Sequence, residues 1–227
     1  MYDSDGKIIY EGDWINDKPE GNGKYICEDG EYYIGQWKNG LRHGKGIEYY
    51  KNGNIKYEVD FINNKYEGIG KYIFEDGEYY IGEFKNGLKH GKGIIYYENG
   101  NIKYDGDFIN DKFEGNGKYI WEVGDYYIGE WKDNLRNGKG ILCYKDGSKY
   151  QGDFFENKIK GYGKYIWEDG EYYIGEFKNG LRDGKGILYY NNAKLMFLGD
   201  IKENKFSISF NFIFKKITLI FTSIFII

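Results

Sequence analysis

The chain has 227 residues, with 35 glycines, 26 tyrosines, 15 phenylalanines, five tryptophans and a single proline. Aromatic residues favour β-strands and abundant glycine supplies turns, so this composition excludes a predominantly helical protein. The formal net charge is −4, with 32 basic and 36 acidic side chains interspersed along the chain. A duplex nucleic-acid binder needs a basic excess or a basic stripe, so we expect no nucleic-acid partner.

Residues 1–9 resemble the second half of an incomplete hairpin that precedes a regular pattern. The segment has no apolar stretch of the kind found in a signal peptide, so we expect a reducing, intracellular environment. The two cysteines, Cys27 and Cys143, make neither a disulfide framework nor a zinc-binding pair. Each aligns with aromatic residues of other repeats, which predicts buried, inert thiols.

From residue 10 the chain repeats Tyr-x-Gly-x-aromatic at a spacing of 23 or 24 residues. A Gly-x-Gly pair follows eleven residues after each tyrosine, and the single departure from the first motif is Val59, where glycine is expected. Tandem repeats of this length predict units that contact mainly their sequence neighbours. The eight units begin at Tyr10, Tyr33, Tyr57, Tyr80, Tyr104, Tyr127, Tyr150 and Tyr173.

A second period of 46 or 47 residues lies over the first. Odd-numbered units continue with Gly-Lys-Tyr-Ile, whereas even-numbered units continue with Gly-Lys-Gly-Ile. The building block is therefore a pair of unlike hairpins.

Strand alternation places Tyr33, Gly35 and Trp37 of the second unit on one face. Gly35 leaves the space into which the neighbouring rings lie. Gln36 points to the other face, and the corresponding residue is Asp or Glu in the seven other units, which indicates a hydrated surface.

The sequence Glu28-Asp29-Gly30-Glu31 carries the Asp-Gly signal of a two-residue hairpin turn. Similar Asp-Gly turns follow at Asp76 and Asp169. Together with the alternation, these turns predict an all-β protein: an elongated, twisted antiparallel β-meander of roughly seventeen strands in a solenoid-like single sheet.

The motif Tyr-x-Gly-x-Trp/Phe, followed by Gly-x-Gly and a turn glycine at a period near 23 residues, resembles the membrane occupation and recognition nexus (MORN) repeat. The resemblance covers residues 10–200, as eight repeats and the start of a ninth, and leaves 201–227 as a hydrophobic tail without the repeat. Proteins similar to this act as scaffolds at membrane and cytoskeletal structures. The repeat is also appended to phosphatidylinositol phosphate kinases and to a lysine methyltransferase, whose separate catalytic domains this chain does not resemble.

No residue set in the repeats predicts catalysis, a cofactor or a metal. The Gly-x-Gly pairs recur eight times and open strands rather than helices, which favours structural turns over phosphate binding. The only histidines, His43 and His90, share a slot that later holds Asn137 and Asp183, so neither is expected to bind metal. An enzyme site or small-molecule site needs asymmetry, and no insertion interrupts the array.

Periodic aromatic patches are the first candidate for a binding surface. In even-numbered units Tyr32 and Ile34 are expected on the face opposite Tyr33 and Trp37, with Tyr25 beside them. Exposed aromatic patches typically bind partner proteins or further copies of the same chain, and the alternative is local packing by sheet curl. The full set is Tyr32, Ile34, Tyr79, Ile81, Tyr126, Ile128, Tyr172 and Ile174.

A basic edge is the second candidate. Loops of the even-numbered units carry two cations each and are expected to project from one edge, where they could meet anionic lipid head groups. The alternative is a solvated edge, because acidic residues of the odd-numbered units lie between them. The cations are Lys38, Arg42, Lys85, Lys89, Lys132, Arg136, Lys178 and Arg182.

Residues 207–227 contain no glycine and are rich in Phe, Ile, Lys and Asn. Three interpretations remain open for them: membrane association, a capping pair of strands, and an incorrect gene model.

The leading functional hypothesis is a non-enzymatic scaffold that binds proteins, located in the cytoplasm at the periphery of a membrane or cytoskeletal structure. The alternatives are direct phosphoinositide binding by the basic edge, and a regulatory fragment of a protein resembling a phosphatidylinositol phosphate kinase.

Overall fold

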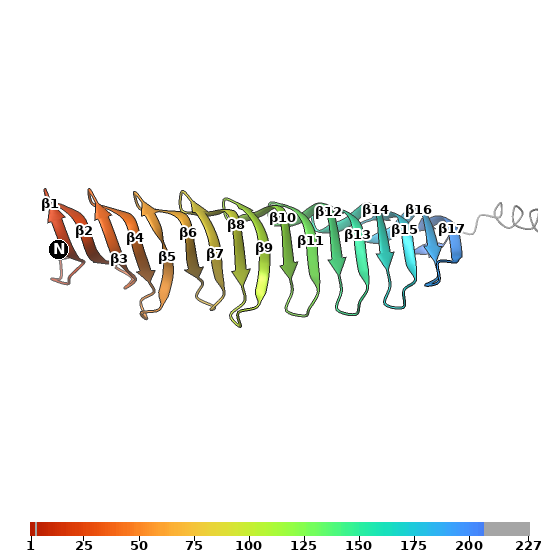
Figure 1. Cartoon of the computed structure of the whole chain (residues 1–227), viewed down its shortest axis with the longest axis horizontal. Helices are drawn as coiled ribbons and strands as arrows, with labels where there is room; N and C mark the ends of the chain where they lie inside the picture. The colour runs from red at the N-terminus through yellow and green to blue at the C-terminus, as the bar shows by residue number, and fades with distance from the viewer. Residues whose placement is uncertain (3, 207–227) are drawn as a thin grey trace, which may run out of the picture. The chain divides into compact units, whose positions relative to one another are not determined.

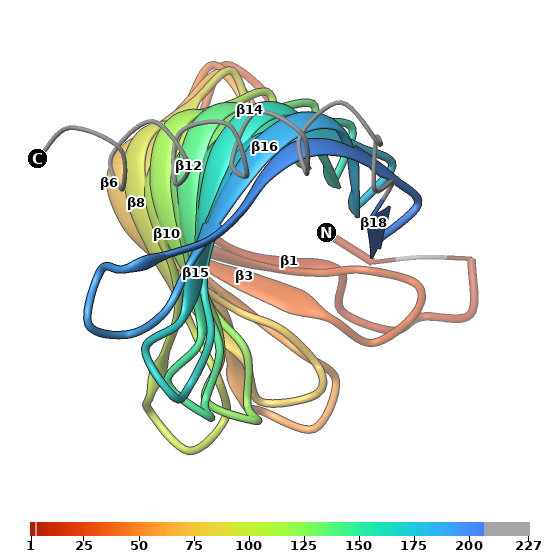
Figure 2. The same cartoon turned by 90° about the vertical axis from the view of Figure 1, so that its right-hand side faces the viewer.

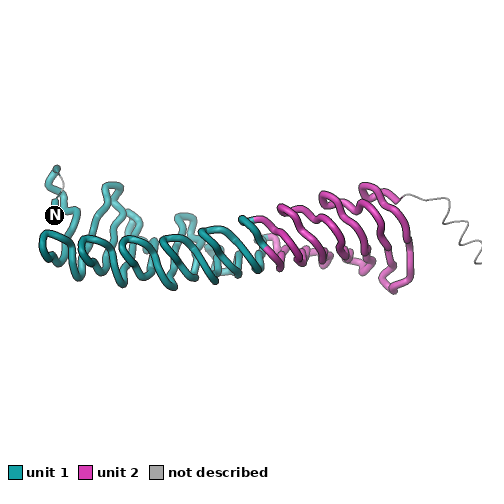
Figure 3. The backbone as a smooth tube through the Cα atoms, turned by 90° about the horizontal axis from the view of Figure 1, so that it is seen from above, with its two compact units in different colours: residues 1–122, 131–134 teal, residues 123–130, 135–227 magenta. Residues whose placement is uncertain are grey.

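A computed structural model describes residues 1–2 and 4–206, and these contain 18 β-strands and no helix (Figure 1). The three interpretations of residues 207–227 lie outside the described residues. The chain divides into two compact units (Figure 3). Unit 1 comprises Met1–Glu122 and Trp131–Asn134, and unit 2 comprises Val123–Glu130 and the chain from Leu135 onward.

Unit 1 is a run of successive antiparallel hairpins, in which each strand pairs with the next one in the sequence. This pairing confirms the predicted all-β meander. Its strands are β1 (Tyr10–Ile15), β2 (Lys18–Ile26), β3 (Tyr32–Lys38), β4 (Leu41–Tyr49), β5 (Ile55–Ile62), β6 (Lys65–Ile73), β7 (Tyr79–Lys85), β8 (Leu88–Tyr96), β9 (Ile102–Ile109) and β10 (Lys112–Ile120).

Unit 2 follows the same rule from β12 to β18. In Figure 2 its strands β14 and β16 arch over one side of the unit. Strand β11 (Tyr126–Lys132) belongs partly to each unit. The strands of unit 2 are β12 (Leu135–Cys143), β13 (Lys149–Phe155), β14 (Lys158–Ile166), β15 (Tyr172–Lys178), β16 (Leu181–Tyr189), β17 (Leu195–Lys202) and β18 (Lys205–Phe206).

In every repeat but the third, the first tyrosine lies flat over two glycines, one from its own motif and one from the following Gly-x-Gly pair. The Tyr33 ring covers Gly35 and Gly46, and its hydroxyl donates to the carbonyl of Gln36 at 3.0 Å. A methyl group at Gly35 would lie 2.6 Å from the Cα atom of Gly46, a distance that real side chains do not reach. Both glycines are therefore required by the ring and the paired backbone, which explains the repeat motif.

These tyrosines form the core, on what we call the inner face of each unit. Tyr33 is 2% exposed and contacts Trp37 edge-to-face, with ring centroids 5.3 Å apart. It also contacts Phe61 of the next repeat at 5.0 Å. Because each ring packs within its repeat and onto the following one, the core is a row of aromatic contacts rather than a globular centre.

The residue after the motif glycine stabilises a bulge in the facing strand. Gly44 has a φ of 69°, and the next amide, of Lys45, donates to the side-chain oxygen of Gln36 at 3.0 Å. The hydrated position predicted for Gln36 is thus also structural. In six other repeats a carboxylate at this position accepts the equivalent hydrogen bond from a backbone amide, namely that of Asp13, Glu83, Asp107, Glu130, Asp153 and Glu176.

The prediction of two-residue turns at Asp-Gly is wrong. Gly30 alone has positive φ, its amide donates to the Cys27 carbonyl at 3.0 Å, and the Cys27 amide donates to Glu31 at 2.8 Å. These bonds define a three-residue loop with glycine in the left-handed position. Two-residue turns occur at the other end of the hairpins, for example at Asn39-Gly40, where both φ angles are positive.

Val59 changes the packing of the third repeat. It is 5% exposed and occupies the place above Gly70 where a tyrosine ring lies in the other repeats. The Tyr57 ring is displaced and instead stacks on Tyr66 at 4.0 Å and on Tyr72 at 4.1 Å. The single departure in the motif therefore remodels the inner face of unit 1.

Candidate functional site

The outer face, opposite the buried tyrosines, carries a recurring cluster that we call the tyrosine patch. In the first one, Tyr32 stacks on Tyr49 with ring centroids 4.6 Å apart, and the Lys24 ammonium lies 4.4 Å from the Tyr32 ring. Beside them Ile34 pairs with Ile47 across the strands and remains 43% exposed. The cluster combines a rigid aromatic pair, an exposed aliphatic side chain and a cation.

The patch recurs with little change in both units. In unit 1 Tyr79 stacks on Tyr96 at 4.6 Å, and in unit 2 Tyr172 stacks on Tyr189 at 4.7 Å. Ile81 and Ile128 are exposed, whereas Ile174 is half-buried. The predicted residues are therefore brought together in each repeat pair, while their role in binding stays a prediction.

The third even-numbered repeat departs from this pattern. Cys143 replaces the second tyrosine, and the pKa of Tyr126 is raised by its hydrogen bond to that thiol. The two cysteines are free, as expected, but half-buried rather than fully buried.

The expectation for Tyr25 is wrong. Tyr25 pairs with Tyr33 across the strands, and its ring lies 6.2 Å from Trp37. Residues paired directly across antiparallel strands share a face. Tyr25 therefore belongs to the inner face and not to the tyrosine patch.

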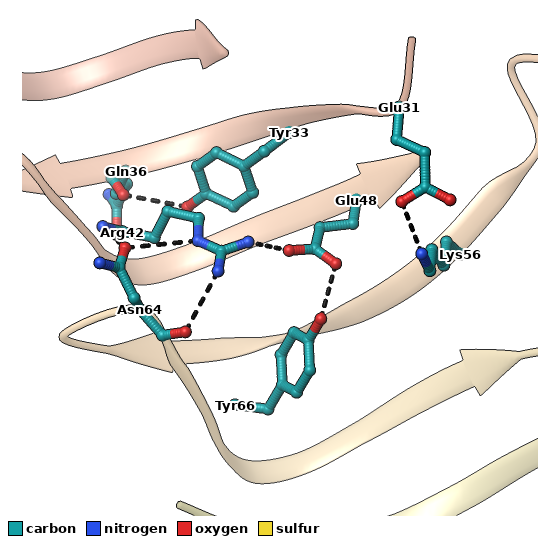
Figure 4. A network of polar contacts seen from close by, with 8 residues as sticks. All are labelled: Glu31, Tyr33, Gln36, Arg42, Glu48, Lys56, Asn64 and Tyr66. Atoms are coloured by element: carbon teal, nitrogen blue, oxygen red, sulfur yellow. Dashed lines mark hydrogen bonds and ion pairs between the residues drawn. The ribbon is translucent and has the colours of Figure 1, made fainter. Parts of the chain in front are cut away.

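Arg42 does not project from an edge as the sequence predicts. Its guanidinium lies 5.6 Å from the Tyr33 ring and 5.1 Å from the Phe61 ring, on the inner face. It forms an ion pair with Glu48 and donates to the carbonyl of Asn64 at 3.2 Å (Figure 4). Arg42 thus connects its own repeat to the next one.

The equivalent cations of the other even-numbered repeats also lie on the inner face. Lys89 forms an ion pair with Asp111 at 3.7 Å, and burial lowers its pKa. Arg136 and Arg182 lie over the rings of Tyr127 and Tyr173. The physical reason is that each of these cations belongs to the strand that follows the turn. Side chains alternate between the two faces along a strand, and the position of the cation directs its side chain to the inner face. The exposed cations of the predicted edge are Lys38, Lys85, Lys132 and Lys178.

Glu48 is a functional candidate that the sequence analysis missed. Its slot holds the buried aliphatic residues Ile95, Leu142 and Leu188 in the other even-numbered repeats. Glu48 accepts a hydrogen bond from the Tyr66 hydroxyl at 2.6 Å, and Tyr66 has its pKa raised by burial and by this carboxylate. The repeat alignment contains the signal, because only this repeat has a carboxylate there.

A hollow of about 520 Å³ lies beside this network on the inner face of unit 1. Tyr25, Cys27, Trp37, Arg42 and Glu48 are among its lining residues. Burial, together with nearby carboxylates, raises the pKa of the Cys27 thiol, so the thiol is not activated as a nucleophile.

Within residues 1–2 and 4–206, no group of three or more His, Cys, Asp or Glu side chains is arranged to hold a metal ion. In the same residues, no helix is long and apolar enough to cross a membrane.

Comparison with protein families gives a match to the MORN repeat in eight consecutive segments, 10–32, 33–55, 57–79, 80–102, 104–126, 127–149, 150–172 and 173–193. These segments begin at the same tyrosines as the eight sequence repeats.

A search of curated proteins finds no match. Among solved structures, the chain is similar to the E1021V mutant of the TCP10 domain of Danio rerio CPAP, with 11% identity and a TM-score of 0.23 over 88% of this chain and 93% of that one. A likeness of this size carries no functional argument.

Proposed function

We propose a function from the premise that this chain belongs to the MORN repeat family: a non-catalytic scaffold that binds partner proteins through its tyrosine patches. Repeats of this family typically act as modules that bind proteins or membranes, and the family is generally non-enzymatic. The single observation that carries the proposal is the recurrence of a stacked tyrosine pair beside an isoleucine, which is exposed at Ile34 and Ile81 and half-buried at Ile174.

The patch has the properties of a binding surface. Each aromatic pair is already ordered, because Tyr32 and Tyr49 stack on each other, so little side-chain entropy is lost on binding. Ile34 offers apolar area that gains stability when it leaves water. A periodic series of such patches favours an extended partner or several copies of one partner.

The test removes the apolar centre of every patch. Ile34, Ile81, Ile128 and Ile174 are changed together to Asp, and the full chain is compared with wild type by affinity capture in cells that express it. We expect capture of specific partners to fall at least about tenfold, because a charge at the centre of an apolar contact must be desolvated.

Ile69→Asp is the matched control, because Ile69 is 77% exposed on an odd-numbered repeat and lies outside the patches. This variant should retain the partners. Equal capture by wild type and by the fourfold variant, with both folded, would sink the proposal. Sedimentation of the same proteins shows whether the chain itself is one of the partners.

Anionic phospholipid is the second candidate, and the four exposed lysines favour it. Each lies at the end of a strand in an even-numbered repeat, namely Lys38, Lys85, Lys132 and Lys178. Reversing these four charges, and leaving Arg42 and Lys89 intact, changes the edge without breaking the inner face. Loss of flotation with phosphoinositide-containing liposomes would support lipid binding, whereas unchanged flotation would exclude the edge.

We also propose a cytoplasmic location at the periphery of a membrane or cytoskeletal structure. Fractionation and imaging of the expressed full chain test this location directly.

A further inference from the structure

One inner-face position holds a large ring in three repeat pairs and a small thiol in the first. The residue is Phe74, Trp121 and Trp167 in the later pairs and Cys27 in the first pair. The ring always packs against the tyrosine two residues before it, at 4.4 Å for Tyr72, 4.9 Å for Tyr119 and 5.0 Å for Tyr165.

The same ring also contacts the cation of the following repeat where both residues lie within one unit. The Lys89 ammonium is 5.2 Å from the Phe74 ring, and the Arg182 guanidinium is 5.2 Å from the Trp167 ring. A cation over an aromatic face is attracted by the ring quadrupole. The position therefore holds a ring between a tyrosine and a cation, and we call it the ring position.

In the first repeat pair the tyrosine and the cation beside the ring position are present, but the ring is not. Tyr25 and Arg42 line the hollow of about 520 Å³, and the Cys27 thiol lies where the ring would begin. A dry cavity of about 150 Å³ is large enough for benzene, so the hollow can take an aromatic side chain. At the corresponding place in unit 2, Trp167 itself forms part of the wall of a hollow.

The surrounding hydrogen bonds and ion pair fix the side chains beside the ring position and leave the hollow open. Arg42 is fixed by Glu48 and by the Asn64 side chain, which accepts from the Arg42 amide at 2.8 Å. Glu48 is in turn fixed by the Tyr66 hydroxyl. Arg42 repels a cationic ligand and Glu48 repels an anionic one. The neutral rings around the hollow therefore favour a neutral aromatic group.

We propose that this hollow binds a phenylalanine or tryptophan side chain presented by a partner protein. The ring would complete the tyrosine–ring–cation arrangement that the later repeats complete with their own residues. The inference rests on the proposed scaffold function, because the ring comes from a bound protein.

The first test uses 5-fluoroindole as the probe and the full chain as the receptor, with binding followed by fluorine NMR. Wild type and Cys27→Ser, which keeps the position small, should bind with dissociation constants within about twofold of each other. Cys27→Trp, which supplies the ring from the chain, should weaken binding at least about tenfold. No binding to wild type, or equal binding to Cys27→Trp, would overturn the proposal.

A second measurement needs no substitution in the hollow. Saturating 5-fluoroindole should slow alkylation of Cys27 at least about fivefold, while Cys143 serves as an internal control whose rate changes less than about twofold. Equal protection of both thiols, or of neither, would contradict binding at this place.

The fourfold Ile→Asp variant separates the two proposals. Lost partner capture with unchanged 5-fluoroindole affinity supports both the patches and the hollow. Retained capture with unchanged affinity removes the patches as the partner surface and leaves the hollow standing. Self-association that disappears when 5-fluoroindole is added would assign the ring to a second copy and overturn a separate partner protein as its source.

Discussion

The carboxylate of Glu48 accepts a hydrogen bond from the Tyr66 hydroxyl and pairs with Arg42, so this side chain links β4, which holds Glu48 and Arg42, to β6, which holds Tyr66. The corresponding positions in the other repeat pairs hold aliphatic residues, and no other even-numbered repeat has this carboxylate. The network is a local departure from a periodic design, and its energetics can be measured one residue at a time.

Glu48→Leu, which introduces the residue of two later repeats, should destabilise the fold by about 1–3 kcal/mol. The reason is that Tyr66 loses its acceptor and Arg42 loses its partner in a half-buried place. Urea unfolding measures the change. Adding Tyr66→Phe should restore part of the loss, because it removes the orphaned hydroxyl. If the two changes are additive, the hydrogen bond contributes nothing.

Gly46→Ala should cost about 2–4 kcal/mol of unfolding free energy, because the added methyl group meets the Tyr33 ring. Gly87→Ala is the control, since Gly87 has open space around it and a φ of 89°. Backbone strain alone should cost this control about 1 kcal/mol. Similar losses in both variants, measured by urea unfolding, would show that the ring contact is not the reason for the glycine.

Val123→Asp should raise the unfolding temperature. Most of the three-residue loops have an Asp or Asn at this place that accepts the amide two residues later, as Asp29 does from Glu31 at 3.0 Å. Val123 has no acceptor and is 63% exposed. The new bond should contribute about 0.5–1 kcal/mol. Val123→Ala removes the exposed apolar side chain without adding an acceptor and should give a smaller gain.

Stability should fall at alkaline pH. Burial raises the pKa of Tyr33, and likewise of Tyr127 and Tyr173, to about 12. Their pKa in the unfolded chain is about 10, so the unfolded state releases protons first as the pH rises. This contribution to stability is complete below pH about 10 and is lost as the pH rises towards about 12. Tyrosinate absorbance and urea unfolding along this range measure it.

Tyr33→Phe should make the alkaline loss less steep, since one buried hydroxyl no longer titrates. Tyr2→Phe is the matched control, because Tyr2 is 66% exposed. An unchanged slope for Tyr33→Phe would contradict burial as the cause.

The repeat pattern was sufficient to predict the strands and to assign the residues of the inner face. Alternation of Tyr33, Gly35 and Trp37 assigned one face correctly because a strand has a period of two, which no tertiary contact alters. The same period places Tyr25 opposite Tyr33 once the register is known. The error for Tyr25 came from the loop, because a three-residue loop at Gly30 shifts the pairing that a two-residue turn implies.

The sequence by itself determined the repeat, the all-β class, the glycines and the tyrosine patches, because these depend on local geometry and on contacts between neighbouring hairpins. Tertiary structure alone decided that Arg42 contacts Phe61 and Asn64 of the next repeat and that Cys27 borders a hollow. Both depend on the distance between side chains of different repeats, and that distance is set by the twist, the bulges and the loop lengths together. Alignment of the repeats shows that the ring is missing at Cys27, but only the tertiary structure shows that the described residues leave a hollow at this place.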